Sequence, residues 1–124
     1  MRYHDFHLTR YEVSDSGKTI VLHLLYDYPD IEKEASVITF SEVTLYNFTH
    51  TASAILTAID EVPLSPFIEE MGTQLTQWHH WHGLALWNGS PQGYALELER
   101  LGYKAWRIDS AIGFSGMVIA KAIR

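Results

Sequence analysis

Apolar and polar residues alternate along the first part of the chain with the period of two that is typical of β-strands. In the clearest run, Thr19–Tyr28, every even-numbered position is apolar or aromatic and the odd-numbered positions are largely apolar too. This pattern predicts a central strand covered on both sides. Residues 3–13 predict another strand, in which the apolar phase slips between Leu8 and Tyr11. A bulge near Thr9–Arg10 would return the apolar side chains to one face, because one extra residue reverses the alternation.

Further segments belong to the same β-rich half. Ser14–Gly17 has the composition of a turn. Val37–Phe48 is a long β-prone stretch with a phase change across Ser41–Glu42, and Asn47–Ser53 is polar and predicts a loop. Ala54–Val62 fits the spacing of a helix or that of a strand, and we interpret it as a strand because its neighbours pair naturally as a meander.

Helical spacing begins after this segment. The pair Ser65–Pro66 is typical of a helix start, because serine can cap the first turn and proline is tolerated in it. A helix over 66–79 is predicted by the apolar residues that follow, which are Phe67, Met71, Leu75 and Trp78. The pair Ser90–Pro91 marks a second helix start, and Gly102 is well placed to end that helix.

The end of the chain predicts two strands, over Tyr103–Ser110 and Met117–Ile123, with a glycine-containing turn over 111–116 between them. Strands therefore cluster early and late, with the helices between them. This order is typical of an α+β fold, in which a mostly antiparallel sheet of about five to seven strands carries one or two helices on one face. With 124 residues, the chain is predicted to be a single domain, 1–124.

Composition narrows the class of protein further. Hydrophobic residues make up 47% of the chain and charged residues 19%, which supplies enough apolar material for a packed core. No apolar run approaches the ~18 residues of a membrane span, and Met1–Asp5 is too polar to begin a signal peptide. The absence of cysteine excludes disulfides, thiolate metal sites and cysteine nucleophiles. These features predict a cytoplasmic globular domain.

Charge is distributed unevenly along the chain. Nine Lys and Arg residues against fifteen Asp and Glu residues give a net charge of −6. No lysine or arginine occurs from Glu34 to Glu99, whereas eight acids do. Because nucleic acids and anionic membranes are bound by clustered cations, neither is expected as a partner. An acidic surface suits a basic protein partner, and a merely acidic protein without such a partner has the same composition.

Histidines offer two candidate sites for chemistry. Residues 79–82 hold three histidines, and neutral imidazole is a common metal ligand. Only two of the three share a face in a helix or in a strand, so we expect a helix C-terminus here and no metal ion. His4, Asp5 and His7 suggest either an acid–base pair or a structural pair. No nucleophile motif or phosphate-binding loop accompanies them, so neither a catalytic residue nor a cofactor is predicted.

Candidate partner-binding residues surround the predicted first helix. We expect one surface patch of four acids, which are Asp60, Glu61, Glu69 and Glu70. The dipole of the helix also stabilises acids near its N-terminus, which explains them without a partner. Trp81 and Trp87 join the candidate set because tryptophan is a common interface anchor, whereas Trp78 and Trp106 are expected in the core.

The segments Tyr3–Phe6, Thr19–Leu24, Val37–Val43, Ala105–Ser110 and Gly113–Lys121 together resemble small bacterial immunity proteins of polymorphic or contact-dependent toxin systems and their uncharacterised relatives. The resemblance implies an α+β protein without chemistry of its own, which neutralises a cognate toxin by occluding its active or substrate-binding surface. Many such toxins are nucleases with basic substrate sites, which an acidic inhibitor fits. The alternative is a small His-rich enzyme or a ligand- or metal-binding domain. The sequence leaves a monomer and a homodimer equally open.

Overall fold

The computed structural model describes residues 3–81 and 90–124, and in this part of the chain it has three helices and one antiparallel sheet of six strands. The strands are β1 (His7–Ser14), β2 (Thr19–Tyr26), β3 (Glu34–Ser41), β4 (Leu45–Val62), β5 (Lys104–Ala120) and β6 (Ala122–Ile123). They are ordered β5-β4-β1-β2-β3-β6. Because β6 follows β5 after one residue and pairs with β3, the sheet curls toward itself. The predicted α+β class is confirmed.

Strand β2 lies at the centre of the sheet, as its two apolar faces predict. It pairs with β1 on one side and with β3 on the other, and its side chains Ile20, Leu22 and Leu24 are at most 2% exposed. The predicted bulge is confirmed too, because the register between β1 and β2 shifts between Leu8 and Arg10. The bulge lets Leu8 face the core, while the rest of β1 keeps its pairing.

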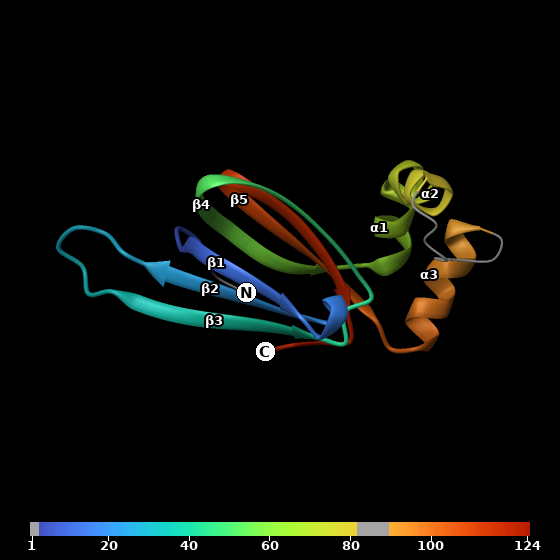
Figure 1. Cartoon of the computed structure of the whole chain (residues 1–124), viewed down its shortest axis with the longest axis horizontal. Helices are drawn as coiled ribbons and strands as arrows, with labels where there is room; N and C mark the ends of the chain where they lie inside the picture. The colour runs from blue at the N-terminus through green and yellow to red at the C-terminus, as the bar shows by residue number, and fades with distance from the viewer. Residues whose placement is uncertain (1–2, 82–89) are drawn as a thin grey trace.

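Strands β4 and β5 form one long, bent ribbon, and here two predictions are wrong. The predicted loop over Asn47–Ser53 lies inside β4, and the predicted turn over 111–116 lies inside β5. The two strands pair from Leu45 opposite Ile119 to Val62 opposite Ala105, with register shifts in the middle. Figure 1 shows the ribbon arching over at the end away from the helices. The polar residues that suggested a loop are the solvent-facing positions of this ribbon.

The bend depends on local backbone geometry. Gly113 has a φ of +81°, and Ser53 on the facing strand has a φ of +66°. The two strands approach closely at this point, since a Cβ on Gly113 would lie 3.0 Å from the Cα of Ala54. On the β5 side, the Ser110 hydroxyl accepts a hydrogen bond from the Phe114 N–H (3.1 Å) and donates one to the Phe114 carbonyl. Glycine and serine therefore turn the chain here without interrupting the strand.

The predicted helix over 66–79 is two helices, α1 (Leu64–Glu70) and α2 (Gly72–Trp81), which are separated at Met71. The predicted serine cap is also wrong. Pro63 occupies the N-cap position without a side-chain hydrogen bond, and the helix already begins at Leu64. An earlier start brings Leu64, Phe67 and Ile68 to the buried face, so packing decides where the helix begins.

Helix α3 (Pro91–Arg100) begins and ends as predicted. The Ser90 hydroxyl oxygen accepts a hydrogen bond from the Gly93 N–H (3.2 Å), and Pro91 follows it in the first turn. Gly102, with a φ of +88°, reverses the chain after the helix. In the described part of the chain, no helix is long and apolar enough to cross a membrane.

The ribbon has buried residues on both faces, which belong to two hydrophobic clusters. The first cluster fills the inside of the curled sheet and includes Trp106, which is 4% exposed as predicted. The second cluster joins the helices to the opposite face of the ribbon, and Trp78 packs against it partly buried. The helices therefore lie at one end of the sheet, against the outside of β4 and β5 (Figure 1).

We expect Gly113→Ala to lower the free energy of unfolding by about 1–3 kcal/mol, because a left-handed residue with a Cβ costs ~1–2 kcal/mol and the new methyl group meets Ala54. Two other glycines separate the cost of the left-handed backbone from the cost of the contact with Ala54. Gly102 has a positive φ but open space, so Gly102→Ala should cost about 1 kcal/mol. Gly72 has open space and no positive φ, so Gly72→Ala should be neutral or stabilising by up to ~1 kcal/mol. Urea denaturation measures all three, and equal losses for Gly113→Ala and Gly102→Ala would contradict the close approach.

Candidate functional site

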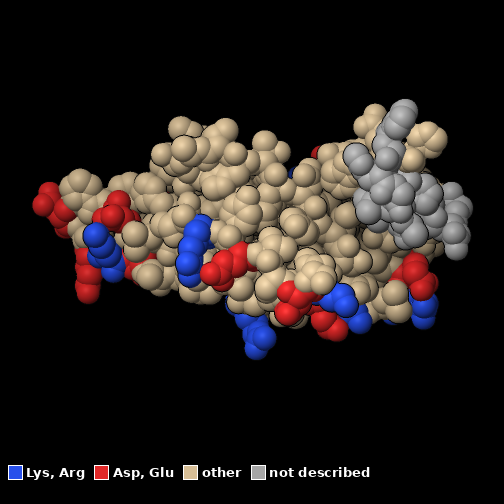
Figure 2. All heavy atoms as spheres, in the orientation of Figure 1, with Lys and Arg blue, Asp and Glu red and all other residues tan. Residues whose placement is uncertain are grey.

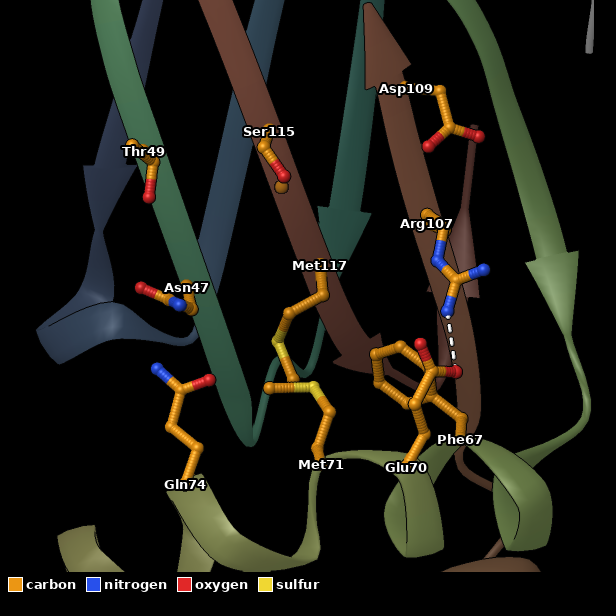
Figure 3. Close-up of a pocket in the computed structure, with 11 residues that line it drawn as sticks. Asn47, Thr49, Phe67, Glu70, Met71, Gln74, Arg107, Asp109, Ser115 and Met117 are labelled. Atoms are coloured by element: carbon orange, nitrogen blue, oxygen red, sulfur yellow. Dashed lines mark hydrogen bonds and ion pairs between the residues drawn. The ribbon is translucent and has the colours of Figure 1, made fainter.

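A cleft of about 410 Å³ opens where the bent ribbon meets the first two helices (Figure 3). Ligand-binding sites typically measure ~300–1,000 Å³, so the cleft is large enough to admit a side chain or a small molecule. Its walls come from four elements, β4, β5, α1 and α2, and comprise Asn47, Thr49, Phe67, Glu70, Met71, Gln74, Arg107, Asp109, Ser115, Gly116 and Met117. The bend places both halves of β5 at the same site.

The cleft combines apolar side chains with polar ones. Phe67 and Met117 are buried, and Met71 is half-buried beside them. Asn47, Thr49 and Ser115 project from neighbouring strands on one side of the cleft, and Gln74 faces them from α2 (Figure 3). Such a surface can take an aliphatic chain against its thioethers and ring while it accepts hydrogen bonds at its rim.

Arg107 is the basic residue of the cleft and is held in place by two contacts. Its guanidinium donates a hydrogen bond to Glu70 Oε2 at 2.9 Å and lies 5.6 Å from the centre of the Phe67 ring. Asp109 follows two residues later on the same face of β5, and Asp60 is the cross-strand neighbour of Arg107. Three carboxylates, of which Glu70 pairs with Arg107, thus outnumber this one cation, and the group carries a net negative charge.

The four predicted acids do not form a uniform patch of free carboxylates. Asp60 and Glu61 are neighbours on β4, so their side chains point to opposite faces. Glu61 lies 3.8 Å from the Lys104 ammonium and Glu70 pairs with Arg107. Glu69 is exposed near the end of α1. Residues 34–99 contain no lysine or arginine, so the cations that pair with Glu61 and Glu70 come from β5.

The predicted tryptophan anchors fall at the border of the described residues. Trp81 is the last residue of α2, and its side chain is not described. Trp87 and His82 lie outside the described residues, and His80 is exposed. Among the residues that the structure describes, no group of three or more histidines and acids could hold a metal ion.

His4, Asp5 and His7 are placed near Tyr28 at the start of the chain. Asp5 lies in a turn with a φ of +66°, and its carboxylate is 3.0 Å from His4 Nδ1 at the surface. His7 is the first residue of β1, and its ring lies beside that of Tyr28. The Tyr28 hydroxyl donates a hydrogen bond to the Asp5 carbonyl (2.6 Å). Desolvation and, secondly, the Asp5 carboxylate raise the pKa of Tyr28. The Asp5 carboxylate therefore lies beside His4, whereas the His7 ring lies beside Tyr28.

Several residues of the cleft carry no recognisable signal of a site in the sequence. Asn47 and Thr49 belong to the segment that predicts a loop, and Arg107 and Asp109 belong to a segment that predicts an ordinary strand. The available signal was a period of two in the polar positions of both segments, which places each pair on one strand face. The polar face of 47–49 and the polar face of 107–109 line one cleft only because the ribbon bends.

We expect Glu70 and Arg107 to be coupled by about 0.5 kcal/mol, within the ~0.2–1 kcal/mol typical of exposed ion pairs. A double-mutant cycle with Glu70→Ala and Arg107→Ala measures this coupling through urea denaturation. It should fall when the salt concentration is raised to ~1 M. The pair Glu61–Lys104 is the control, because its atoms are 3.8 Å apart and both side chains are 55% exposed. Equal coupling in the two cycles would show that the contact with Phe67 does not fix Arg107.

No family model, no curated protein and no solved structure matches the chain. The resemblance to immunity proteins therefore stays a prediction. The geometry and charge of the cleft are the basis for assigning a function to this chain.

Proposed function

We propose that the protein is a non-catalytic binding protein, and specifically an immunity protein that neutralises a cognate basic toxin by covering its active or substrate-binding surface. The observation that carries the proposal is the cleft in which Glu70, Asp109 and the nearby Asp60 outnumber Arg107. An acidic site with an apolar floor is complementary to a lysine or arginine side chain of a protein partner.

Such a side chain needs both parts of the cleft. Lysine and arginine bury their aliphatic stems against apolar surface and keep the charged head among polar groups. Here Met71 and Met117 offer the apolar surface, and Asp109 offers a carboxylate that is exposed on the rim. Because Arg107 already lies over the Phe67 ring, the cleft holds a guanidinium of its own chain in a comparable environment.

A growth assay tests the function directly. We expect the product of the gene beside this chain's gene to arrest bacterial growth when expressed alone, and co-expression of this chain to restore growth. The two proteins should then co-purify as a complex. A neighbouring product that is harmless, or an arrest that this chain does not relieve, would overturn the proposal.

The role of the cleft is tested by the rate of association with that neighbouring protein. We expect the double variant Asp60→Asn and Asp109→Asn to associate severalfold more slowly at low salt, because charge steering speeds encounter. Above ~0.5 M salt most of the difference should vanish, since the charges are screened.

The matched control for this measurement is the double variant Glu42→Gln and Glu99→Gln. It removes the same charge from exposed positions that do not line the cleft. Both variants should remain folded, because exposed charges contribute little to stability. An equal slowing in both would assign the effect to net charge and remove the cleft from the interface.

A further inference from the structure

The border of the sheet at β3 is only partly covered within the described part of the chain. Strand β6 and the residue after it pair with Thr39, Phe40 and Ser41, and the Thr39 N–H and carbonyl both bond to Arg124 (2.8 and 2.9 Å). The preceding residues, 34–38, pair with β2 alone. Figure 1 shows this part of β3 continuing past β6 toward the β2–β3 connection, which projects from the end of the sheet away from the helices.

The direction of the backbone groups follows from the contact at Thr39. In an antiparallel strand, alternate residues direct both backbone groups to the same side. Because Thr39 bonds to Arg124 on the side away from β2, Val37 and Ala35 also direct their N–H and carbonyl groups to that side. Ser36 and Ile38 direct theirs toward β2. Two donors and two acceptors therefore lie along an open edge about 17 Å long, at ~3.4 Å per residue.

The side chains beside this edge are apolar and acidic. Val37 and Ile31 are each 53% exposed, although both are large apolar residues. The β2–β3 connection and the first residue of β3 supply four acids, which are Asp27, Asp30, Glu32 and Glu34. Lys33 lies 3.7 Å from Asp27 and offsets one of them. Figure 2 shows acidic and basic side chains gathered at the left end of the molecule, where the β2–β3 connection lies in Figure 1.

We propose that the open edge of β3, residues 34–38, binds an extended basic segment of a partner protein as an additional strand. Backbone hydrogen bonds to Ala35 and Val37 hold the segment, and its alternate side chains contact the surface beside the edge and determine specificity. An apolar residue opposite Val37 packs on the outer face, and a lysine or arginine opposite Glu34 pairs with the acids. The preferred segment therefore alternates apolar and basic residues.

Charge selects this occupant over a second copy of the chain. Each copy carries a net charge of −6, so two copies repel one another at low salt. The acids also disfavour pairing of the edge with uncharged apolar strands, because charged residues at sheet borders limit aggregation in natural proteins. A basic segment turns the same acids into attractive contacts.

Amide hydrogen exchange of the full chain tests the proposal, with the capped heptapeptide Lys-Val-Lys-Val-Lys-Val-Lys as the probe. At saturating peptide we expect the exchange of the Ala35 and Val37 amides to slow at least fivefold. The Ser36 and Ile38 amides, which are bonded to β2, should change little. A Glu-Val peptide of the same length should give no protection. Unchanged exchange at Ala35 and Val37, or equal protection by both peptides, would overturn the proposal.

Three variants refine the test. Val37→Pro removes a donor that the fold does not use and should weaken peptide binding at least tenfold, whereas Val37→Thr keeps that donor and should bind within threefold of the wild type. Glu32→Gln with Glu34→Gln leaves the backbone unchanged and should weaken binding severalfold at low salt only, which keeps the proposal falsifiable if the proline variant unfolds. Protection that rises with protein concentration in the absence of peptide would identify a second copy as the occupant and overturn the proposal.

The open edge of β3 and the cleft are separate sites, so each can be tested without the other. The double variant Asp60→Asn and Asp109→Asn should bind the heptapeptide as the wild type does. An effect of the cleft variant on peptide affinity would contradict a site at β3. A harmless neighbouring gene product would overturn the immunity function and leave the exchange result unchanged.

Discussion

The close approach of Gly113 to Ala54 is the constraint on which the rest of the structure depends. At this point the backbones of β4 and β5 are so near that a Cβ on Gly113 would lie 3.0 Å from the Cα of Ala54. A ribbon that bends here can bury one face inside the curled sheet and offer the other to the helices. Without the bend, strands of 17 and 18 residues would extend far beyond the three shorter strands β1, β2 and β3 beside them.

The cleft is a consequence of the same bend, and so is its electrostatics. Residues 34–99 contain no lysine or arginine, and their acids would repel one another if the segment folded against itself alone. Pairing with β5 brings Arg107 beside Glu70 and Lys104 beside Glu61. The cations neutralise those two acids and leave Asp60 and Asp109 exposed. The bend therefore determines which negative charges remain available to a partner.

Sequence patterns predicted the elements whose signals are local. The alternation in β2, the bulge near Arg10, the Ser90 cap and the stop at Gly102 each depend on residues within one element. The patterns failed where a distant contact decides the outcome. The polar residues within 47–53 lie on the solvent side of a strand that pairs with β5, and α1 begins at Leu64 because the second cluster buries that side chain. The site follows the same division, since the charge of Glu70 is evident from the sequence whereas Arg107 and Asp109 join it only through the bend.

As proposed, the cleft and the open edge of β3 recognise different features of a protein. The cleft lies beside the helices, and in the proposed function it accepts a single side chain through carboxylates and an apolar floor. The edge lies toward the opposite end of the molecule, next to the β2–β3 connection (Figure 1), and in the proposed interaction it accepts main-chain groups. A short peptide can satisfy one of them, whereas both together require a folded partner that presents a basic strand and, some distance away, a projecting lysine or arginine. Specificity then arises from the spacing between the two contacts, because acidity alone would attract any basic protein.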